Sequence, residues 1–528
     1  MGREKEKQMK SFMQLIFSIL IVASLAACSD NESDKIEDQT NVKAISTQKP
    51  NIVIFYVDDL GYGDLSSYGA TKVQTPSIDK LAKEGIRYTD AHSPAATCTP
   101  SRYSLLTGEL AIRNNAAILP GDAPLIIDPN KPTLPKMLSE KGYTTGVVGK
   151  WHLGVGRGEV NWNEAVKPGP LEIGFDYSFL MPATGDRVPT VYLENHHVVN
   201  LDPNDPITIS YEGKIGDRPT GTEDPELLKQ KADLQHSGTI VNGISRIGWM
   251  KGGKSAEWID EEFYSVFTNK AIEFIENNKS NPFMLFFPFH DIHVPRSPNA
   301  MFAGATGMGP RGDAILQVDW MTGQIVNALR ERGILENTLI IFSSDNGPVL
   351  DDGYADQAVE LIGDHQPAGP FGEGKYSAHE GGTRVPMITY FANQQTPGIS
   401  NALMSHIDLY ASLAKLVGYE LDKNEAIDSK NVLPALLHAD EKGRQVMVEE
   451  AFTLALRDGD WKYIAPFEGS TPGWLENKDV RTGISSEPQL YNLKTDIKEL
   501  NNLAKEYPQK VADMASQLNQ ILARTSRG

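Results

Sequence analysis

The sequence predicts an α/β fold, with a large domain built on a central mixed sheet that helices flank. Two observations predict it: continuous apolar runs, which are typical of strands buried on both faces, and amphipathic helical stretches that alternate with them. A third observation, a cluster of short strands near the C-terminus, predicts a smaller α+β domain with an antiparallel sheet. We expect the large domain at residues 49–440 and the smaller one at residues 441–528.

Composition and charge narrow the class of protein. The chain has 528 residues, of which 40% are hydrophobic and 23% charged, as in folded globular proteins. Its formal net charge of -19 argues against nucleic acid or an anionic membrane face as the main partner. A local cationic pocket could still bind an anionic substrate.

The N-terminus predicts export. Basic residues precede the apolar run 15–25, as in a secretory signal; they are Arg3, Lys5, Lys7 and Lys10. The run ends in LAAC at residues 25–28, which resembles the bacterial lipoprotein box. That resemblance implies a signal peptide at 1–27, a lipid on Cys28 and an outer-membrane location, at the cell surface or on the periplasmic face. Residues 28–48 are polar and acidic, which predicts a flexible tether. A transmembrane anchor is the alternative, but the apolar run is shorter than the ~20 residues that a span needs.

The first half of the large domain places polar residues after buried strands. The strand at 51–57 (NIVIFYV) ends in Asp58 and Asp59, and we expect Gly61 and Gly63 to let the backbone turn there. The strand at 143–148 leads to Lys150 and His152. Helices are expected at 76–83 and 133–141, and a short strand at 86–89.

A helix is also expected at Cys98, because Pro100 suits a first helical position and Thr99 an N-cap. Cys98 would then lie at the helix mouth, where an anion is favoured. Arg102, four residues on, would share its helical face.

Residues 156–254 are rich in Gly, Pro, Asp and Asn and show weak periodicity, so long loops and short strands are expected over the site. Five residues in this stretch are candidate sugar contacts, although a lone loop histidine is more often simply exposed. They are Asp186, Arg187, His196, His197 and His236.

The second half of the large domain also places polar residues directly after predicted buried strands. The strand at 283–289 leads to His290 and His293, and the strand at 338–343 leads to Asp345 and Asn346. Lys375 lies in a glycine-rich stretch. Helices are expected at 258–277, 312–332 and 406–417, and a strand at 387–391. In the smaller domain we expect strands at 446–451, 454–456, 461–464 and 490–493 and a helix at 508–522.

The positions of these polar residues along the predicted strands indicate a ligand-binding site. Open α/β sheets bind their ligands at the carboxyl ends of strands, and most of the candidates lie there. Asp58, Asp59, Asp345 and Asn346 all offer oxygen donors. Such a set suits a hard cation, Ca²⁺ or alternatively Mg²⁺, better than Zn²⁺.

Several motifs resemble those of type I sulfatases in the alkaline-phosphatase superfamily, in the family's order. They are CTPSR at 98–102, VDDLG at 57–61, GKWHLG at 149–154 and SDNG at 344–347. The resemblance covers about residues 49–420 and implies an alkaline-phosphatase-like fold. It further implies that Cys98 is oxidised to formylglycine (3-oxoalanine) by a maturation enzyme.

The resemblance also implies roles for the other site residues. Formylglycine from Cys98 would join Asp58, Asp59, Asp345 and Asn346 around Ca²⁺. Arg102 would steady the hydrated aldehyde, Lys150 and Lys375 would bind sulfate, His293 would protonate the leaving sugar oxygen, and His152 would take a proton so that sulfate leaves. Asp345 could accept the proton of the attacking hydroxyl. No role follows for His365 or His379.

The implied reaction is hydrolysis of sulfate esters on a polysaccharide or oligosaccharide, for example an algal one such as ulvan or carrageenan. Two alternatives stay open. One is a phosphatase or phosphodiesterase of the same superfamily, in which Ser or Thr is the nucleophile and two Zn²⁺ ions are held by several histidines. The other is a glycan-binding lipoprotein without catalysis.

Overall fold

We describe the protein from a computed structural model, which describes residues 49–392, 394–475 and 478–527. Residues 47–528 form one compact unit, so the predicted domain boundary at 440 stays a prediction. The predicted signal peptide, the tether and Cys28 lie outside the described residues. Within the described part, none of the helices has the length and apolar character needed to cross a bilayer.

A ten-stranded mixed sheet forms the centre, which confirms the predicted fold class. Its middle strands run parallel, and antiparallel strands join on both sides. In spatial order the strands are β15 (Gly398–Ser400), β2 (Ile86–Tyr88), β14 (Met387–Tyr390), β13 (Thr338–Ser344), β1 (Asn51–Val57), β12 (Phe283–Pro288), β4 (Thr144–Lys150), β5 (Tyr177–Met181), β6 (Leu193–Glu194) and β7 (His197–Val198).

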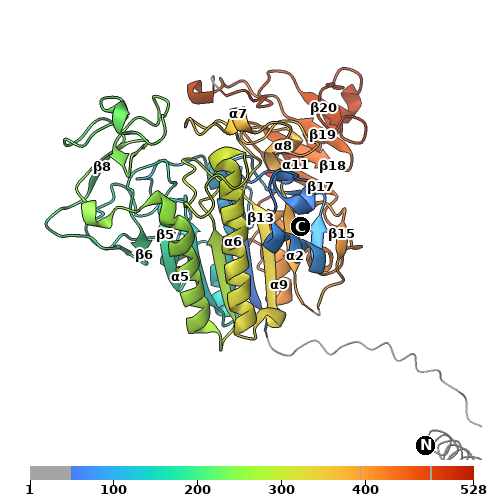
Figure 1. Cartoon of the computed structure of the whole chain (residues 1–528). Coiled ribbons are helices and arrows are strands. Elements are labelled where there is room, and N and C mark those ends of the chain that lie inside the picture. Colours follow the sequence, from blue (N-terminus) through green and yellow to red (C-terminus); the bar gives the residue numbers. More distant parts are fainter. Residues whose placement is uncertain (1–48, 393, 476–477, 528) are drawn as a thin grey trace, which may run out of the picture. The chain divides into compact units, whose positions relative to one another are not determined.

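Helices cover both faces of this sheet because its central strands are apolar on both. In β1, Ile52 and Ile54 pack into one core, and Val53 and Phe55 pack into the other. The first core is covered by α3 (Cys98–Thr107), α4 (Leu134–Glu140), α9 (Leu409–Leu416) and α10 (Leu433–Leu437). The second is covered by α2 (Pro76–Glu84), α5 (Phe263–Asn278) and α6 (Gly309–Glu331), and Figure 1 shows α5 and α6 side by side on it.

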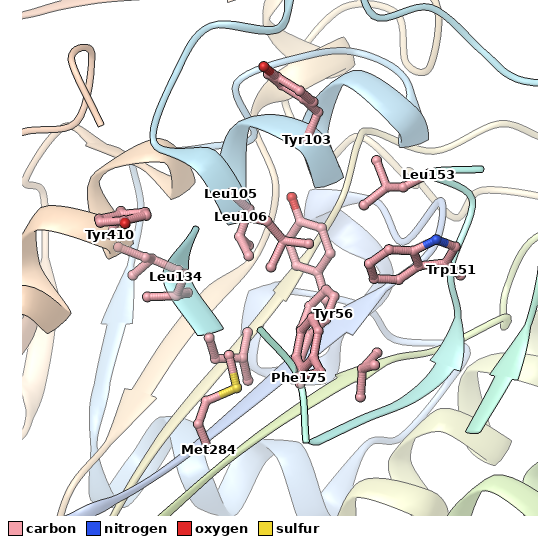
Figure 2. Packing of buried hydrophobic residues seen from close by; sticks show 14 of the residues in the cluster. Tyr56, Tyr103, Leu105, Leu106, Leu134, Trp151, Leu153, Phe175, Met284 and Tyr410 are labelled. Carbon is pink, nitrogen blue, oxygen red and sulfur yellow. The ribbon is translucent and has the colours of Figure 1, made fainter. Parts of the chain in front are cut away.

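The first core packs against α3, the helix that carries Cys98 and Arg102. Figure 2 shows Tyr56 of β1 among Leu105, Leu106 and Trp151, all of them buried. The Tyr56 ring lies 5.9 Å from the Arg102 guanidinium. Each large apolar side chain that is fully buried here stabilises the fold by about 1.5–3 kcal/mol. The packing therefore fixes the helix that carries Cys98 and Arg102.

A four-stranded antiparallel sheet follows near the C-terminus, as predicted. Its order is β17 (Val446–Glu450), β18 (Leu454–Asp458), β19 (Trp461–Ile464) and β20 (Gln489–Asn492), and α11 (Pro508–Leu522) packs on it. Buried cations join it to the segment that precedes β14: Lys462 Nζ lies 3.1 Å from Glu380 Oε1, and Arg457 Nη1 lies 3.0 Å from Glu380 Oε2. Glu380 is the first residue of α8 (Glu380–Thr383), and its carboxylate also pairs with Arg384 Nη1 at 3.0 Å. Arg384 thus has a structural role.

Most predicted elements occur within a few residues of their expected bounds, but two expectations were wrong. First, α3 begins at Cys98 with Thr97 as its N-cap residue, two positions earlier than expected. Pro100 is tolerated there because the first N–H groups of a helix have no partner in the helix. Second, residues 156–254 contain short strands as expected, but three of these strands, β5, β6 and β7, belong to the large sheet and extend it. The strand β15 and the helix α10 were not expected either. These elements are too short to show a clear period.

Candidate active site

The ends of β1 and β13 bring four oxygen-bearing side chains together. The two strands are parallel neighbours, so Asp58 and Asp59 emerge beside Asp345 and Asn346. Asp59 has a φ of 60°, the left-handed region, and this bend lets two adjacent carboxylates serve one site. The turn that we expected from the nearby glycines is therefore made at Asp59 itself. All four side chains are buried.

This cluster fits a hard divalent cation. Ligand atoms of Asp58, Asp59, Cys98 and Asp345 all lie within 4.8 Å of one another. Asn346 Nδ2 donates to Asp59 Oδ1 at 2.7 Å, while Asn346 Oδ1 is buried without a hydrogen-bond partner. A buried amide oxygen beside three carboxylates is a ready ligand for Ca²⁺ or Mg²⁺. The structure thus brings together all five residues that the sequence analysis assigned to the metal.

Cys98 lies at the centre of this group. Its Sγ is 3.5 Å from Asp58 Oδ1 and 3.5 Å from Lys150 Nζ. Burial and the neighbouring Asp58 carboxylate raise the pKa of the thiol above its usual value. An unmodified Cys98 therefore stays protonated near neutral pH and is a poor nucleophile.

Three cations surround the carboxylates. Arg102 donates from Nε and Nη2 to Asp345 Oδ2 at 3.0 and 2.7 Å, and Lys150 pairs with Asp58. Lys375 Nζ lies 2.9 Å from Asp59 Oδ2 and 3.1 Å from Asp352 Oδ2. Burial by itself would lower the pKa of Lys375, but Asp352 and Asp59 raise it well above its usual value. We call Asp58, Asp59, Cys98, Arg102, Lys150, Asp345, Asn346 and Lys375 the pocket floor.

Two histidines lie above the floor with their ring hydrogens fixed by backbone carbonyls. His152 Nε2 donates to the Leu119 carbonyl at 2.9 Å, which leaves Nδ1 buried without a partner. His293 Nδ1 donates to the Val294 carbonyl at 2.6 Å, and its Nε2 lies 4.0 Å from Asp59 Oδ2. Burial, and then Lys150, lower the pKa of both rings well below the usual value. Each ring is therefore neutral and has one unprotonated nitrogen.

A cavity of about 450 Å³ opens above Cys98. His152, His293 and Lys375 line it near the floor. Higher up it is enclosed by Asp186, Arg187, Tyr211, His236, Phe452 and Trp474, which we call the pocket walls. The floor comes mainly from strand ends, with Cys98 and Arg102 supplied by α3 and Lys375 by a loop, whereas the walls come from loops and from the C-terminal sheet region. The volume is in the usual range for a small-ligand site.

Three of the five candidate sugar contacts lie in these walls. Arg187 Nη1 donates to Asp186 Oδ1 at 2.8 Å, and His236 Nε2 lies 3.5 Å from Asp186 Oδ2. Burial would lower the pKa of His236, but hydrogen bonds to Asp186 and Asp233 raise it to about 9. The ring is therefore a cation near neutral pH. His196 and His197 lie outside the cavity: His196 pairs with Glu172 at 3.0 Å, and His197 is exposed.

Some site residues were not found from the sequence. Asp352 holds Lys375 and accepts a hydrogen bond from the Tyr376 hydroxyl at 3.0 Å, and Trp474 lies 5.1 Å from the Tyr376 ring. Their positions depend on loops, which carry no periodic signal. The only available cue for Asp352 was that it follows the SDNG motif by five residues.

The three other histidines named in the sequence analysis lie away from the cavity. His365 Nε2 pairs with Asp64 Oδ1 at 2.8 Å, and the Ser377 hydroxyl lies 3.0 Å from His379 Nδ1. His290 is buried against Phe263 with neither ring nitrogen hydrogen-bonded. None of the three lines the cavity above Cys98.

Comparison with known proteins identifies the class to which this fold and site belong. The family model described as Sulfatase matches residues 50–419, so the chain belongs to the sulfatase family. It is a sulfuric ester hydrolase with the α/β architecture of the alkaline-phosphatase superfamily.

Individual relatives span nearly the whole chain. The chain is 47% identical over 520 residues to an N-acetylgalactosamine-6-O-sulfatase of Bacteroides thetaiotaomicron, covering 98% of this chain and 100% of the relative. It is 29% identical to human arylsulfatase A, covering 86% of this chain and 83% of that protein. A solved Bacteroides thetaiotaomicron sulfatase, described with the metabolism of multiple glycosaminoglycans, superposes with a TM-score of 0.88 at 49% identity, covering 90% of this chain and 100% of that one.

Proposed function

We propose that this sulfatase hydrolyses the 6-O-sulfate ester of N-acetylgalactosamine units in a glycan, with formylglycine at position 98 and one bound Ca²⁺. The observation that carries the proposal is the convergence on Cys98: its Sγ lies 3.5 Å from both Asp58 and Lys150, at the bottom of a cavity of about 450 Å³. The full-length relative that bears the name N-acetylgalactosamine-6-O-sulfatase supports this sugar and this ester position.

Ca²⁺ would be held by Asp58, Asp59, Asp345 and Asn346, and Mg²⁺ is the second choice. The unpartnered Asn346 Oδ1 supports this assignment, as does the absence of a histidine among these four residues. When bound, the cation supplies charge that offsets the buried carboxylates and polarises a sulfate oxygen.

A formylglycine-generating enzyme would supply the external oxidant for a two-electron oxidation of the Cys98 Cβ, in which a C=O bond replaces the C–S bond and the sulfur leaves as sulfide. The hydrated aldehyde supplies one hydroxyl that takes the sulfuryl group and a second whose deprotonation releases sulfate and restores the aldehyde. Arg102 is held by Asp345 one helical turn from position 98, where its charge steadies that hydrate. Lys150 and Lys375 bind the sulfate oxygens and stabilise charge as the ester bond breaks.

The two histidines divide the proton transfers. His152 Nδ1 is buried, unprotonated and without a partner, so it can accept the proton of the second hydroxyl. His293 presents Nε2 to the site, and a bound sulfate monoanion favours protonation of that ring. It can then give the proton to the departing sugar oxygen.

The cellular setting is part of the same proposal. The lipoprotein box at residues 25–28 supports a lipid on Cys28 and attachment to the outer membrane, at the surface or on the periplasmic face. A sulfated algal polysaccharide such as ulvan or carrageenan has less support as a substrate than N-acetylgalactosamine 6-sulfate.

The test is release of sulfate by protein that was produced together with the maturation enzyme. We expect turnover of N-acetylgalactosamine 6-sulfate well above that of the 4-sulfate, of ulvan or carrageenan fragments and of an aryl phosphate. The Cys98→Ala variant should lose all turnover, because its methyl side chain carries no heteroatom from which the aldehyde hydrate could be made.

Two outcomes would contradict the proposal. Turnover of an aryl sulfate without turnover of the 6-sulfated sugar would refute the substrate. Full activity of Cys98→Ala would refute the mechanism. Thermal unfolding of the Cys98→Ala variant should match the parent, since the substitution removes one heavy atom, the Cys98 sulfur.

A further inference from the structure

A second cavity lies beside the active-site pocket. It has a volume of about 730 Å³, and it shares Gln235 and Trp474 with the lining of the first cavity. Its own walls are residues 231–234, residues 350–351 and 353–360, and Lys478. We call this cavity the outer groove. A chain-like substrate whose sulfated unit fills the first cavity can extend past Trp474 into it.

The walls of the outer groove are held in place before any ligand binds. The Ala355 N–H donates to the Lys231 carbonyl at 2.9 Å, and the Asp233 N–H donates to the Gly353 carbonyl at 2.9 Å. These two hydrogen bonds join the two wall segments. Beneath them, the buried Arg296 guanidinium binds Asp356 at 2.7 Å and the Val349 and Leu350 carbonyls at 2.8 and 3.0 Å. A ligand would therefore meet a preformed surface.

The surface of the groove combines apolar and hydroxyl-binding groups. Leu234 is 89% exposed and Val359 is 53% exposed, and the half-buried Trp474 lies at the junction with the active-site pocket. Asp351 and Glu360 line the same groove and are exposed. A sugar ring presents C–H groups on its faces and hydroxyls on its rim, so it matches this combination of apolar and carboxylate groups in one concave site.

Charge distinguishes the groove from the pocket next to it. The pocket contains Lys375, Arg187 and a protonated His236. In the groove, Asp351 and Glu360 have no cationic partner among the residues that the structure describes, and Lys231 is the exposed cation; Lys478 is paired with Asp352 at 2.8 Å. The unpaired groups thus carry net negative charge, which favours sugar hydroxyls over a carboxylate or a second sulfate.

We propose that the outer groove is a second sugar subsite, which binds the uncharged sugar unit next to the sulfated one. The inference rests on the proposed function, because it assumes that the sulfated sugar occupies the first cavity. It adds that the enzyme acts on oligosaccharides in preference to a free monosaccharide. It also assigns the preference for the neighbouring unit to Leu234, Val359, Asp351 and Glu360, which lie outside the active-site pocket.

The test compares kcat/KM for three substrates with the same 6-sulfated sugar: the monosaccharide, a disaccharide with a neutral hexose neighbour, and a disaccharide with a uronic acid neighbour. We expect the neutral disaccharide to exceed the monosaccharide by about tenfold or more. The Leu234→Ser, Val359→Ser double variant should remove that advantage and leave the monosaccharide value within about twofold of the parent, because neither residue lines the active-site pocket.

A charge reversal tests the choice of neighbour. Glu360→Lys should raise kcat/KM for the uronic acid disaccharide relative to the neutral one, whereas Glu420→Lys, the same change at an exposed site outside the groove, should not. Equal values for the monosaccharide and the neutral disaccharide would overturn the subsite. A parent enzyme that prefers the uronic acid neighbour would overturn its charge preference. Failure on the monosaccharide and both disaccharides, with an aryl sulfate still turned over, would count against the proposed function instead.

Discussion

The floor and the walls of the active-site pocket come from different kinds of secondary structure. Floor residues such as Asp58, Asp345 and Lys150 lie at or just beyond the ends of parallel strands, and they are 0% exposed. Among the wall residues, Arg187 lies on a loop and Trp474 lies in the short 3-10 helix Gly473–Leu475. Most of the floor is therefore placed by the register of the sheet, with Cys98 and Arg102 added by α3, while the walls are held by their own local contacts.

This difference separates the reaction from the choice of substrate. Each floor side chain is bonded to another floor side chain, so a change at one disturbs the group that handles sulfate. The walls line the part of the same cavity that the sugar would fill in the proposed function. Substitutions in the floor should therefore affect every sulfate ester, and substitutions in the walls only those whose sugar they contact.

The largest effect is expected from Lys375→Ala in the floor. The ammonium group stabilises charge on sulfate, and its loss leaves Asp59 without its ammonium partner, whereas Asp352 keeps Lys478 at 2.8 Å. We expect kcat/KM to fall by about 100- to 1,000-fold on both an aryl sulfate and the sugar sulfate. Lys494→Ala, which removes an exposed ammonium, is the matched control. A loss confined to the sugar substrate would erase the distinction between floor and walls.

A smaller and more selective effect is expected from Arg187→Ala in the walls. The guanidinium lines the cavity and can donate hydrogen bonds to sugar hydroxyls. We expect kcat/KM for the sugar sulfate to fall about tenfold to 100-fold, and that for an aryl sulfate to stay within about threefold. The exposed Arg157→Ala is the matched control. Equal losses on both substrates would assign Arg187 to the chemistry.

The contrast between floor and walls also explains which site residues could be predicted from the sequence. Asp58, Asp59, Asp345 and Asn346 were predictable because continuous apolar runs identify buried strands, and the carboxyl ends of parallel strands meet at one edge. The start of α3 was misplaced by two residues because several residues before Pro100 suit an N-cap. Lys375 and His293 depended on the family resemblance as well.

The walls could be predicted only in part. Asp186, Arg187 and His236 were candidates along with two histidines that lie elsewhere, and no local pattern separates the two groups. Asp352 and Trp474 reach the site through irregular segments, whose path depends on tertiary contacts such as the pairing of Asp352 with Lys375 at 3.1 Å. Sequence periodicity carries no information about such contacts.

The central claim is that the floor holds one divalent cation through Asp58, Asp59, Asp345 and Asn346. The most direct measurement is calorimetric titration of metal-depleted protein with Ca²⁺, for the parent, Asp345→Asn, Asn346→Ala and the exposed control Asp460→Asn. We expect one ion per chain in the parent and in the control, and an affinity at least about 100-fold lower in the two floor variants. Absence of binding in the parent, or unchanged affinity in both floor variants, would contradict the claim.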